Sequence, residues 1–209
     1  MDFDEIIASR AELREIIDPP HEVVLRKEIS RLDDFCRDFI ARSPFLLVAS
    51  SDGEGSIDIS PKGDPAGFVK VLDDTTLAIP ERPGNGRADT FENVLRHPFV
   101  GLIFLIPGTR NTLRVRGKAR LVRDDWLRES MVVNAKLPDI ALVVDVTVAY
   151  FHCAKCVIRS KLWSAEQLAA TGTRDDLLLA ETMVKHGDLS VTVDRMQEVI
   201  VHNEETELY

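Results

Sequence analysis

The chain has 209 residues, 44% of them hydrophobic, and a net charge of −9. It is long enough to bury a core. Its acidity argues against nucleic acid as a partner, because such binding depends on neutralising phosphates with Lys and Arg. The charge is uneven: residues 1–30 and 164–209 carry net charges of −4 and −7, and the centre is slightly basic. Such a distribution suits a small anionic ligand held centrally.

The sequence predicts a cytoplasmic protein with no membrane association. Its acidic, amphipathic start lacks the basic region of a signal peptide. The longest apolar stretch, Phe99 to Pro107, is too short to cross a bilayer. Three cysteines, an odd number, indicate a reducing compartment rather than a disulfide framework.

Two helices are predicted before the first strand. Apolar residues recur at helical spacing through residues 3–17, and the paired prolines that follow end this helix. A second helix is predicted over about residues 30–42, with Ser30 as its N-cap. The apolar face of the second helix is formed by Leu32, Phe35, Cys36, Phe39 and Ile40.

The middle of the chain reads as short strands separated by tight turns. The predicted strands span residues 44–50, 56–60, 68–72, 75–80, 97–107, 112–122 and 140–149, and two helices interrupt them at about 87–96 and near 124–134. Seven such strands in succession predict an antiparallel barrel that is closed or nearly closed, because closure removes exposed strand edges.

The end of the chain returns to a helical pattern. Helices are predicted over residues 151–162, about 173–186 and about 191–206. With no repeat and no low-complexity linker, the sequence predicts one domain over residues 1–209. Its three parts are a helical extension (1–42), the barrel (about 43–150) and a helical C-terminal part (151–209).

Residues 56–96 hold the candidate site. Two of the strands in this stretch run into loops that carry cations: Lys62 in the first loop, and Arg82 and Arg87 in the second. Glycines in the second loop lie just before a predicted helix start, where free N–H groups and the helix dipole bind anions. The loop lacks the Walker sequence, and Asp89 stands where a dinucleotide motif needs a third glycine. We interpret it as a phosphate-binding loop; an ordinary glycine N-cap would have the same pattern.

Two further stretches could carry chemistry. Cations alternate with apolar residues along 112–122, which fits either an anion-binding face or, more commonly, a solvated strand face. If residues 151–163 are helical, His152, Lys155, Arg159 and Trp163 share one face that suits a phosphate or an aromatic ring; a buried Trp163 with solvated cations is the alternative. The Cys153-x-x-Cys156 pair lacks the further ligands of a structural zinc site, so no metal is predicted.

Three segments together resemble a known family. They are PFLLVASSDGEGSIDISPKGDPAGFV, LAIPERPGNGRADTFENVLRHPFVGLIF and TLRVRGKARLV. Their order is similar to that of the pyridoxamine 5′-phosphate oxidase-like family of FMN-binding split barrels, over about residues 35–165. AYFHCAKCVIRSKLW looks like one uncharacterised branch rather than the oxidase proper. The resemblance implies an α+β fold: a six- to seven-stranded antiparallel split β-barrel with flanking N- and C-terminal helices.

The resemblance also implies a homodimer with FMN at the subunit interface. By this resemblance, four residues would lie beside the flavin ring and phosphate: Ser60, Lys62, Gly63 and Asp64. Two would contact the ring through their backbone: Ile79 and Pro80. Three would bind the phosphate: Arg82, Asn85 and Arg87. Thr112 falls where the oxidases use a glutamine. Three residues would reach a cofactor, either that of their own subunit or that of the partner: Lys155, Arg159 and Trp163.

Three functions follow from this resemblance. The first is an FMN-dependent oxidoreductase acting on an unidentified small molecule. The second is a flavin-binding protein that stores or carries FMN without turnover. The third is a barrel that has lost flavin and binds another anion or a partner protein. Pyridoxamine phosphate oxidation does not follow, because the C-terminal segment differs from that of the oxidases.

Overall fold

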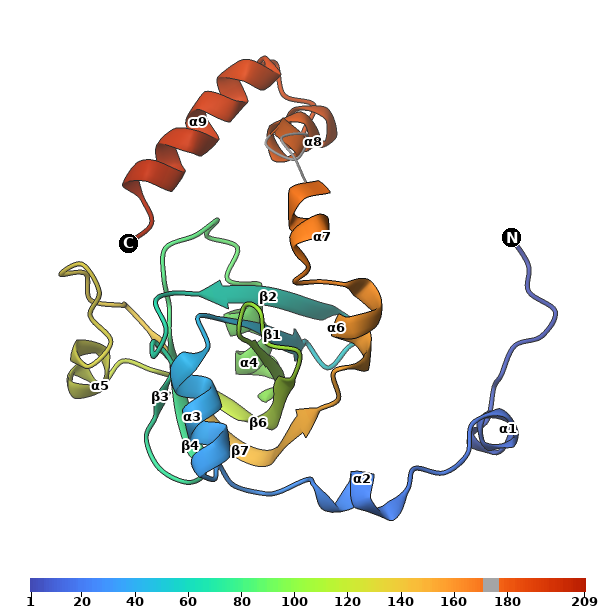
Figure 1. Ribbon diagram of the computed structural model, residues 1–209. Helices are drawn as coiled ribbons and strands as arrows, with labels where there is room; N and C mark the ends of the chain where they lie inside the picture. The colour runs from blue at the N-terminus through green and yellow to red at the C-terminus, as the bar shows by residue number, and fades with distance from the viewer. Residues whose placement is uncertain (171–176) are drawn as a thin grey trace.

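The computed structural model describes residues 1–170 and 177–209 (Figure 1). One antiparallel sheet forms its body, with α3 (Asp34–Arg42) and α4 (Asp89–Arg96) packed against it and a long arm at each end of the chain. Among the described residues, no helix is long and apolar enough to span a membrane.

The sheet has seven strands in the order β2-β1-β5-β6-β7-β4-β3. All of their pairings are antiparallel. The strands are β1 (Phe45–Ser51), β2 (Ile57–Gly63), β3 (Lys70–Val71), β4 (Thr76–Pro80), β5 (Phe99–Leu105), β6 (Thr112–Val122) and β7 (Ala141–His152). The predicted split barrel is confirmed: the sheet curls but does not close, because β2 and β3 remain its two edges.

The core is formed by side chains from one face of this sheet, because successive side chains of a strand point to opposite faces. Along β1, β5 and β6 every second side chain is buried. The largest fully buried side chains include Phe104, Leu46, Leu102 and Leu113. The opposite face of β6 carries the predicted row of cations, of which Arg116 is paired with Glu28 and Arg120 with Asp145. This row is therefore a solvated strand face.

The first strand of the candidate site is longer than predicted. Residues 61–63 continue β2 instead of forming a loop, because Pro61, Lys62 and Gly63 pair with the first three residues of β1. Proline is tolerated there because β2 is an edge strand, where one N–H face needs no partner. Lys62 is thus held by a strand, not by a loop.

The N-terminal helices differ from the prediction. α1 spans Arg10–Ile16 rather than 3–17, because the Ser9 hydroxyl accepts the Glu12 N–H and the Glu12 carboxylate accepts the Ala8 N–H, which fixes the helix start. A short helix that the sequence did not predict, α2 (Glu22–Arg26), follows. Neither helix has a buried residue.

The third helix begins later than predicted. α3 spans Asp34–Arg42, and its N-cap is Asp33, whose carboxylate accepts the Cys36 N–H at 2.9 Å, not Ser30. Four residues of the predicted apolar face are buried and lie against the sheet, whereas Phe35 is exposed. Burial raises the pKa of the Cys36 thiol to about 12, so this cysteine is an inert core residue.

The helices after β4 are shorter than predicted, apart from one that was not predicted. They are α4 (Asp89–Arg96), α5 (Asp125–Glu129), α6 (Lys155–Ser160), α7 (Ala165–Ala170), α8 (Leu178–His186) and α9 (Val193–Thr206). The helix predicted over 151–162 loses its first residues to β7, because β6 offers partners as far as His152. α7 was not predicted, and the start of the helix predicted at about 173–186 lies outside the described residues.

Candidate functional site

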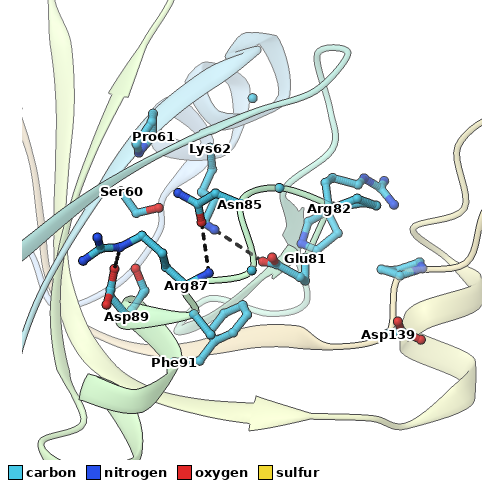
Figure 2. Close-up of a pocket in the computed structure, with 18 of the residues that line it drawn as sticks. Ser60, Pro61, Lys62, Glu81, Arg82, Asn85, Arg87, Asp89, Phe91 and Asp139 are labelled. Atoms are coloured by element: carbon cyan, nitrogen blue, oxygen red, sulfur yellow. Dashed lines mark hydrogen bonds and ion pairs between the residues drawn. The ribbon is translucent and has the colours of Figure 1, made fainter. Parts of the chain in front are cut away.

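A pocket of about 840 Å³ lies beside the edge strand β2. Its walls come from β2, from the segment that joins β4 to α4, and from residues 136–139 (Figure 2). Seven residues that the family resemblance placed at a cofactor line it: Ser60, Lys62, Gly63, Pro80, Arg82, Asn85 and Arg87. The end of β2 and the segment after β4 therefore line one pocket.

Strand β2 presents its polar side chains to this pocket. Because strand side chains alternate, Asp58, Ser60 and Lys62 point to the same face of β2. The Lys62 Nζ lies 3.3 Å from a carboxylate oxygen of Glu81 and 5.4 Å from the centre of the Phe91 ring. The Asp58 carboxylate accepts a hydrogen bond from the Thr90 hydroxyl at 3.0 Å, which ties the strand to α4.

The two arginines of the second loop have different surroundings. The Arg82 Nε donates to Asp64 at 2.6 Å and an Nη to the Met131 carbonyl at 2.7 Å. The Arg82 side chain is 14% exposed and that of Asp64 1%, so this is a buried ion pair. Arg87, at 70% exposure, pairs with Asp89 at 2.6 Å, and this neighbouring carboxylate raises the pKa of the guanidinium. In Figure 2, Asn85 and Arg87 lie toward Ser60, while Arg82 lies on the far side of Glu81.

The start of α4 lies at the pocket and has no side-chain cap. Its N-cap, Ala88, has a left-handed backbone (φ 56°) and no side chain caps the helix. Asn85 folds back so that its side-chain oxygen accepts the Arg87 N–H at 3.1 Å. Gly86, which precedes Arg87, has a φ of 71°, a backbone conformation that glycine adopts without strain. The uncapped start faces the pocket that Ala88 and Asp89 line.

Sequence reasoning missed several residues that line the pocket. Lys136 reaches it from the turn after α5, where the left-handed residues Asn134 and Ala135 reverse the chain. Phe68 and Phe91 add aromatic surface, and Tyr209 enters from the segment that follows α9. The two phenylalanines lie in or next to the motifs already singled out, but no local pattern marks Lys136 or Tyr209.

Six predicted site residues do not line the pocket. Asp64 supports it through Arg82, and Ile79 is buried in β4, where it pairs with Leu142. Thr112 begins β6 opposite His152. The other three follow β7: Lys155 and Arg159 are exposed on α6, and the Trp163 indole donates to the Thr109 carbonyl at 2.9 Å.

The shared helical face predicted for residues 152–163 is absent. His152 is the last residue of β7, and α6 ends before Trp163. Burial, followed by the charges of Arg114 and Lys27, lowers the pKa of the His152 imidazole. Cys153 and Cys156 are free and exposed. Within the described part of the chain, no three His, Cys, Asp or Glu residues gather as a metal site would require.

Comparison with known proteins agrees with this architecture. The family model of pyridoxamine 5′-phosphate oxidase matches residues 32–153, more than half of the chain, so the protein belongs to the pyridoxamine 5′-phosphate oxidase family. The matched range contains the whole sheet and most of the pocket. No curated protein matches the chain.

Several solved structures are similar to the body of the chain. HupZ from Group A Streptococcus is 19% identical, with a TM-score of 0.47 over 57% of this chain and 92% of its own. An FMN-binding protein from Syntrophomonas wolfei is 13% identical (TM-score 0.42; 55% and 86% covered). The heme storage protein HutZ from Vibrio cholerae is 15% identical (TM-score 0.41; 59% and 94% covered).

Proposed function

We propose that the protein binds FMN in the pocket beside β2. The observation that carries this proposal is the donor set: an ammonium, a guanidinium and an amide, those of Lys62, Arg87 and Asn85, face one pocket at an uncapped helix start. Such donors fit a phosphate dianion. The volume of about 840 Å³ falls in the range of small-molecule sites, and Phe68, Phe91 and Pro80 supply apolar surface for a ring system. Membership of the pyridoxamine 5′-phosphate oxidase family supports the same ligand.

The residues of this site would divide the task of holding FMN. Lys62 and Arg87 each have one carboxylate partner, Glu81 and Asp89, that a phosphate could replace. Arg82 is engaged by Asp64 and Met131, so we assign it the role of positioning the loop. This division modifies the expectation that both arginines grip the phosphate.

We further propose that the protein is an FMN-dependent oxidoreductase. When bound, FMN supplies transfer of electrons or a hydride to or from a small substrate. The chain's residues around the pocket, among them Lys62, Arg87 and Phe91, would bind, orient and shield the reactants. These are binding roles, and they fit the second candidate equally well: a protein that stores or carries FMN without turnover.

We propose that the protein is a homodimer. Four side chains on the outer face of neighbouring strands β2, β1 and β5 are large, apolar and exposed: Phe45, Ile57, Ile59 and Phe99. A contiguous apolar face of this kind is typical of a subunit interface. In such a dimer Thr112, Lys155, Arg159 and Trp163 could serve the partner's pocket, which would reconcile their position with their predicted role.

An absorbance spectrum of the purified protein tests the proposal. Flavin absorbance, with FMN released by heat or rebound when added to the apoprotein, is the expected result. Anaerobic addition of a reduced nicotinamide cofactor then separates the two candidates: bleaching that air reverses supports the oxidoreductase, and an unchanged spectrum supports the carrier. Protein that neither contains nor takes up FMN would refute flavin binding and leave the third possibility, another anion.

A further inference from the structure

Tyr209, three residues beyond α9, docks at the pocket from outside the family-matched region. Its hydroxyl donates to a carboxylate oxygen of Asp64 at 2.8 Å, across 145 positions of sequence. The Arg82 guanidinium carbon lies 5.6 Å from the centre of the Tyr209 ring, within reach of a cation–π contact. Tyr209 therefore contacts both members of the buried ion pair that supports the loop.

The contact satisfies a group that would otherwise be costly to bury. The Asp64 side chain is 1% exposed, and Arg82 occupies only one of its two carboxylate oxygens. Tyr209 donates to the other oxygen, and this hydrogen bond raises the pKa of the phenol. A buried carboxylate needs such partners because desolvation is expensive. The position of Tyr209 is thus specified by a hydrogen bond to a buried carboxylate and not only by the shape of the pocket.

The contact is also important for the acidic C-terminal helices. α9 has no buried residue, and it packs against α8 rather than lying on the sheet. In Figure 1 the helix pair stands away from the body, and the chain returns toward the body only at its end. Docking of Tyr209 holds the end of this arm beside the pocket.

We propose that Tyr209 is a ligand-binding residue, an aromatic wall that Asp64 and Arg82 hold in place beside the bound ring. The pocket keeps its volume of about 840 Å³ with Tyr209 docked, so ligand and tyrosine fit together and need not compete. The ligand class is a planar aromatic ring system that carries a phosphate. The identity of that ligand rests on the proposed function, whereas the docking of Tyr209 does not.

Docking can be tested without any ligand. A Glu-specific protease can cut after Glu204, Glu205 and Glu207, and intact mass reports the loss of the C-terminal residues. We expect Tyr209→Ala to be cut at least about fivefold faster than wild type, the factor that one hydrogen bond of about 1 kcal/mol supplies. The cleavage rate of Tyr209→Phe should lie between those of wild type and Tyr209→Ala. Tyr150→Phe, which changes the only other tyrosine, is the control and should match wild type. Equal rates for Tyr209→Ala and wild type would overturn the docking.

The role in binding can be tested with FMN itself. Tyr209→Phe keeps the ring and should release FMN nearly as slowly as wild type. Tyr209→Ala should release it about 2- to 10-fold faster, the value of one aromatic contact, with more residual flavin fluorescence. Added FMN should also slow cleavage of the wild-type tail. Faster cleavage with FMN, or equal release from Tyr209→Ala and wild type, would overturn this inference and leave flavin binding intact. Wild type that binds no FMN would instead refute the proposed function and the ligand role, while the protease result still decides the docking.

Discussion

Arg82 and Arg87 stand five positions apart in one loop and have opposite environments. Arg82 is nearly buried and bonded to a buried carboxylate, while Arg87 is mostly exposed and its carboxylate partner is also accessible. A buried pair loses several kcal/mol when one partner is removed, whereas an exposed pair is worth about 0–1 kcal/mol. Arg82 is therefore suited to stabilising the fold, and Arg87 is suited to exchanging its carboxylate partner for a ligand.

Replacing Arg87 should weaken FMN binding without unfolding the protein. Loss of a charge-assisted hydrogen bond of about 1.5–3 kcal/mol predicts a Kd about 10- to 100-fold higher for Arg87→Ala. Titration of apoprotein with FMN, followed by quenching of flavin fluorescence, measures this change. The control is Arg96→Ala, which removes an equally exposed arginine from the last turn of α4 and should leave the Kd unchanged. An equal loss of FMN affinity in both variants would show that the affinity depends on the overall charge and not on the position of Arg87.

Replacing Arg82 should act on stability. Arg82→Ala leaves Asp64 buried without its charge partner, which predicts a loss of about 3–5 kcal/mol in the free energy of unfolding. Arg87→Ala should lose less than about 1 kcal/mol, because its ion pair is exposed. Urea unfolding of both variants measures the difference. Similar losses would mean that the Asp64 pair contributes little to the fold.

The lowered pKa of His152 predicts a pH dependence of stability. Because the folded protein binds this proton less readily than the unfolded chain, stability falls as pH drops below the unfolded pKa of about 6.5. Wild type should therefore lose more stability than His152→Gln between pH 7.5 and pH 5.5. Urea midpoints of both proteins at the two pH values give the comparison, and parallel losses would contradict the assignment.

At the scale of elements, the β6–β7 pair depends on one glycine. The register shifts between Arg116 and Gly117, where a Cβ on Gly117 would lie 2.3 Å from the Asp145 carbonyl oxygen. Gly117→Ala should therefore cost about 1–3 kcal/mol or more of stability, as overpacking does. The matched control is Gly84→Ala, whose Cβ would meet nothing within 4 Å. Urea unfolding measures both, and equal midpoints would show that the bulge adapts to a side chain.

The strands were predictable where alternation and turn residues agreed. The predicted bounds of β6 match the structure, since its residues alternate between buried and more exposed positions from Thr112 to Arg120. Helix lengths were less predictable. Periodicity extended the first helix back to residue 3, although the Ser9 cap and the lack of a core begin it at Arg10. The strand continuation through Lys62 depends on pairing with β1, which no local pattern reports.

The site was predictable only in its local part. Lys62, Asn85 and Arg87 belong to motifs that the sequence displays, and the structure brings them to one pocket. Lys136 and Tyr209 reach it through long-range folding, so neither could be found from spacing. The commitment of Arg82 to Asp64 was equally hidden, because sequence gives charge but not burial.

At the scale of the whole molecule, the apolar outer face of β2, β1 and β5 predicts association. Ile59 lies on this face at 62% exposure, so Ile59→Asp should shift the proposed dimer toward monomer with little effect on the fold. Sedimentation velocity measures the change. Leu168→Asp, which places the same charge on the exposed surface of α7, should leave the assembly unchanged. A wild-type monomer, or an unaffected Ile59→Asp dimer, would exclude this face as the interface.

The carboxylates paired with Lys62, Arg82 and Arg87 have one more consequence. Because each of these cations already has an internal counter-ion, the pocket does not depend on an incoming phosphate to offset repulsion between the cations. We expect the newly made chain to fold before any prosthetic group arrives and to remain ready for loading. Production of the polypeptide and supply of the proposed flavin could then be separated in time.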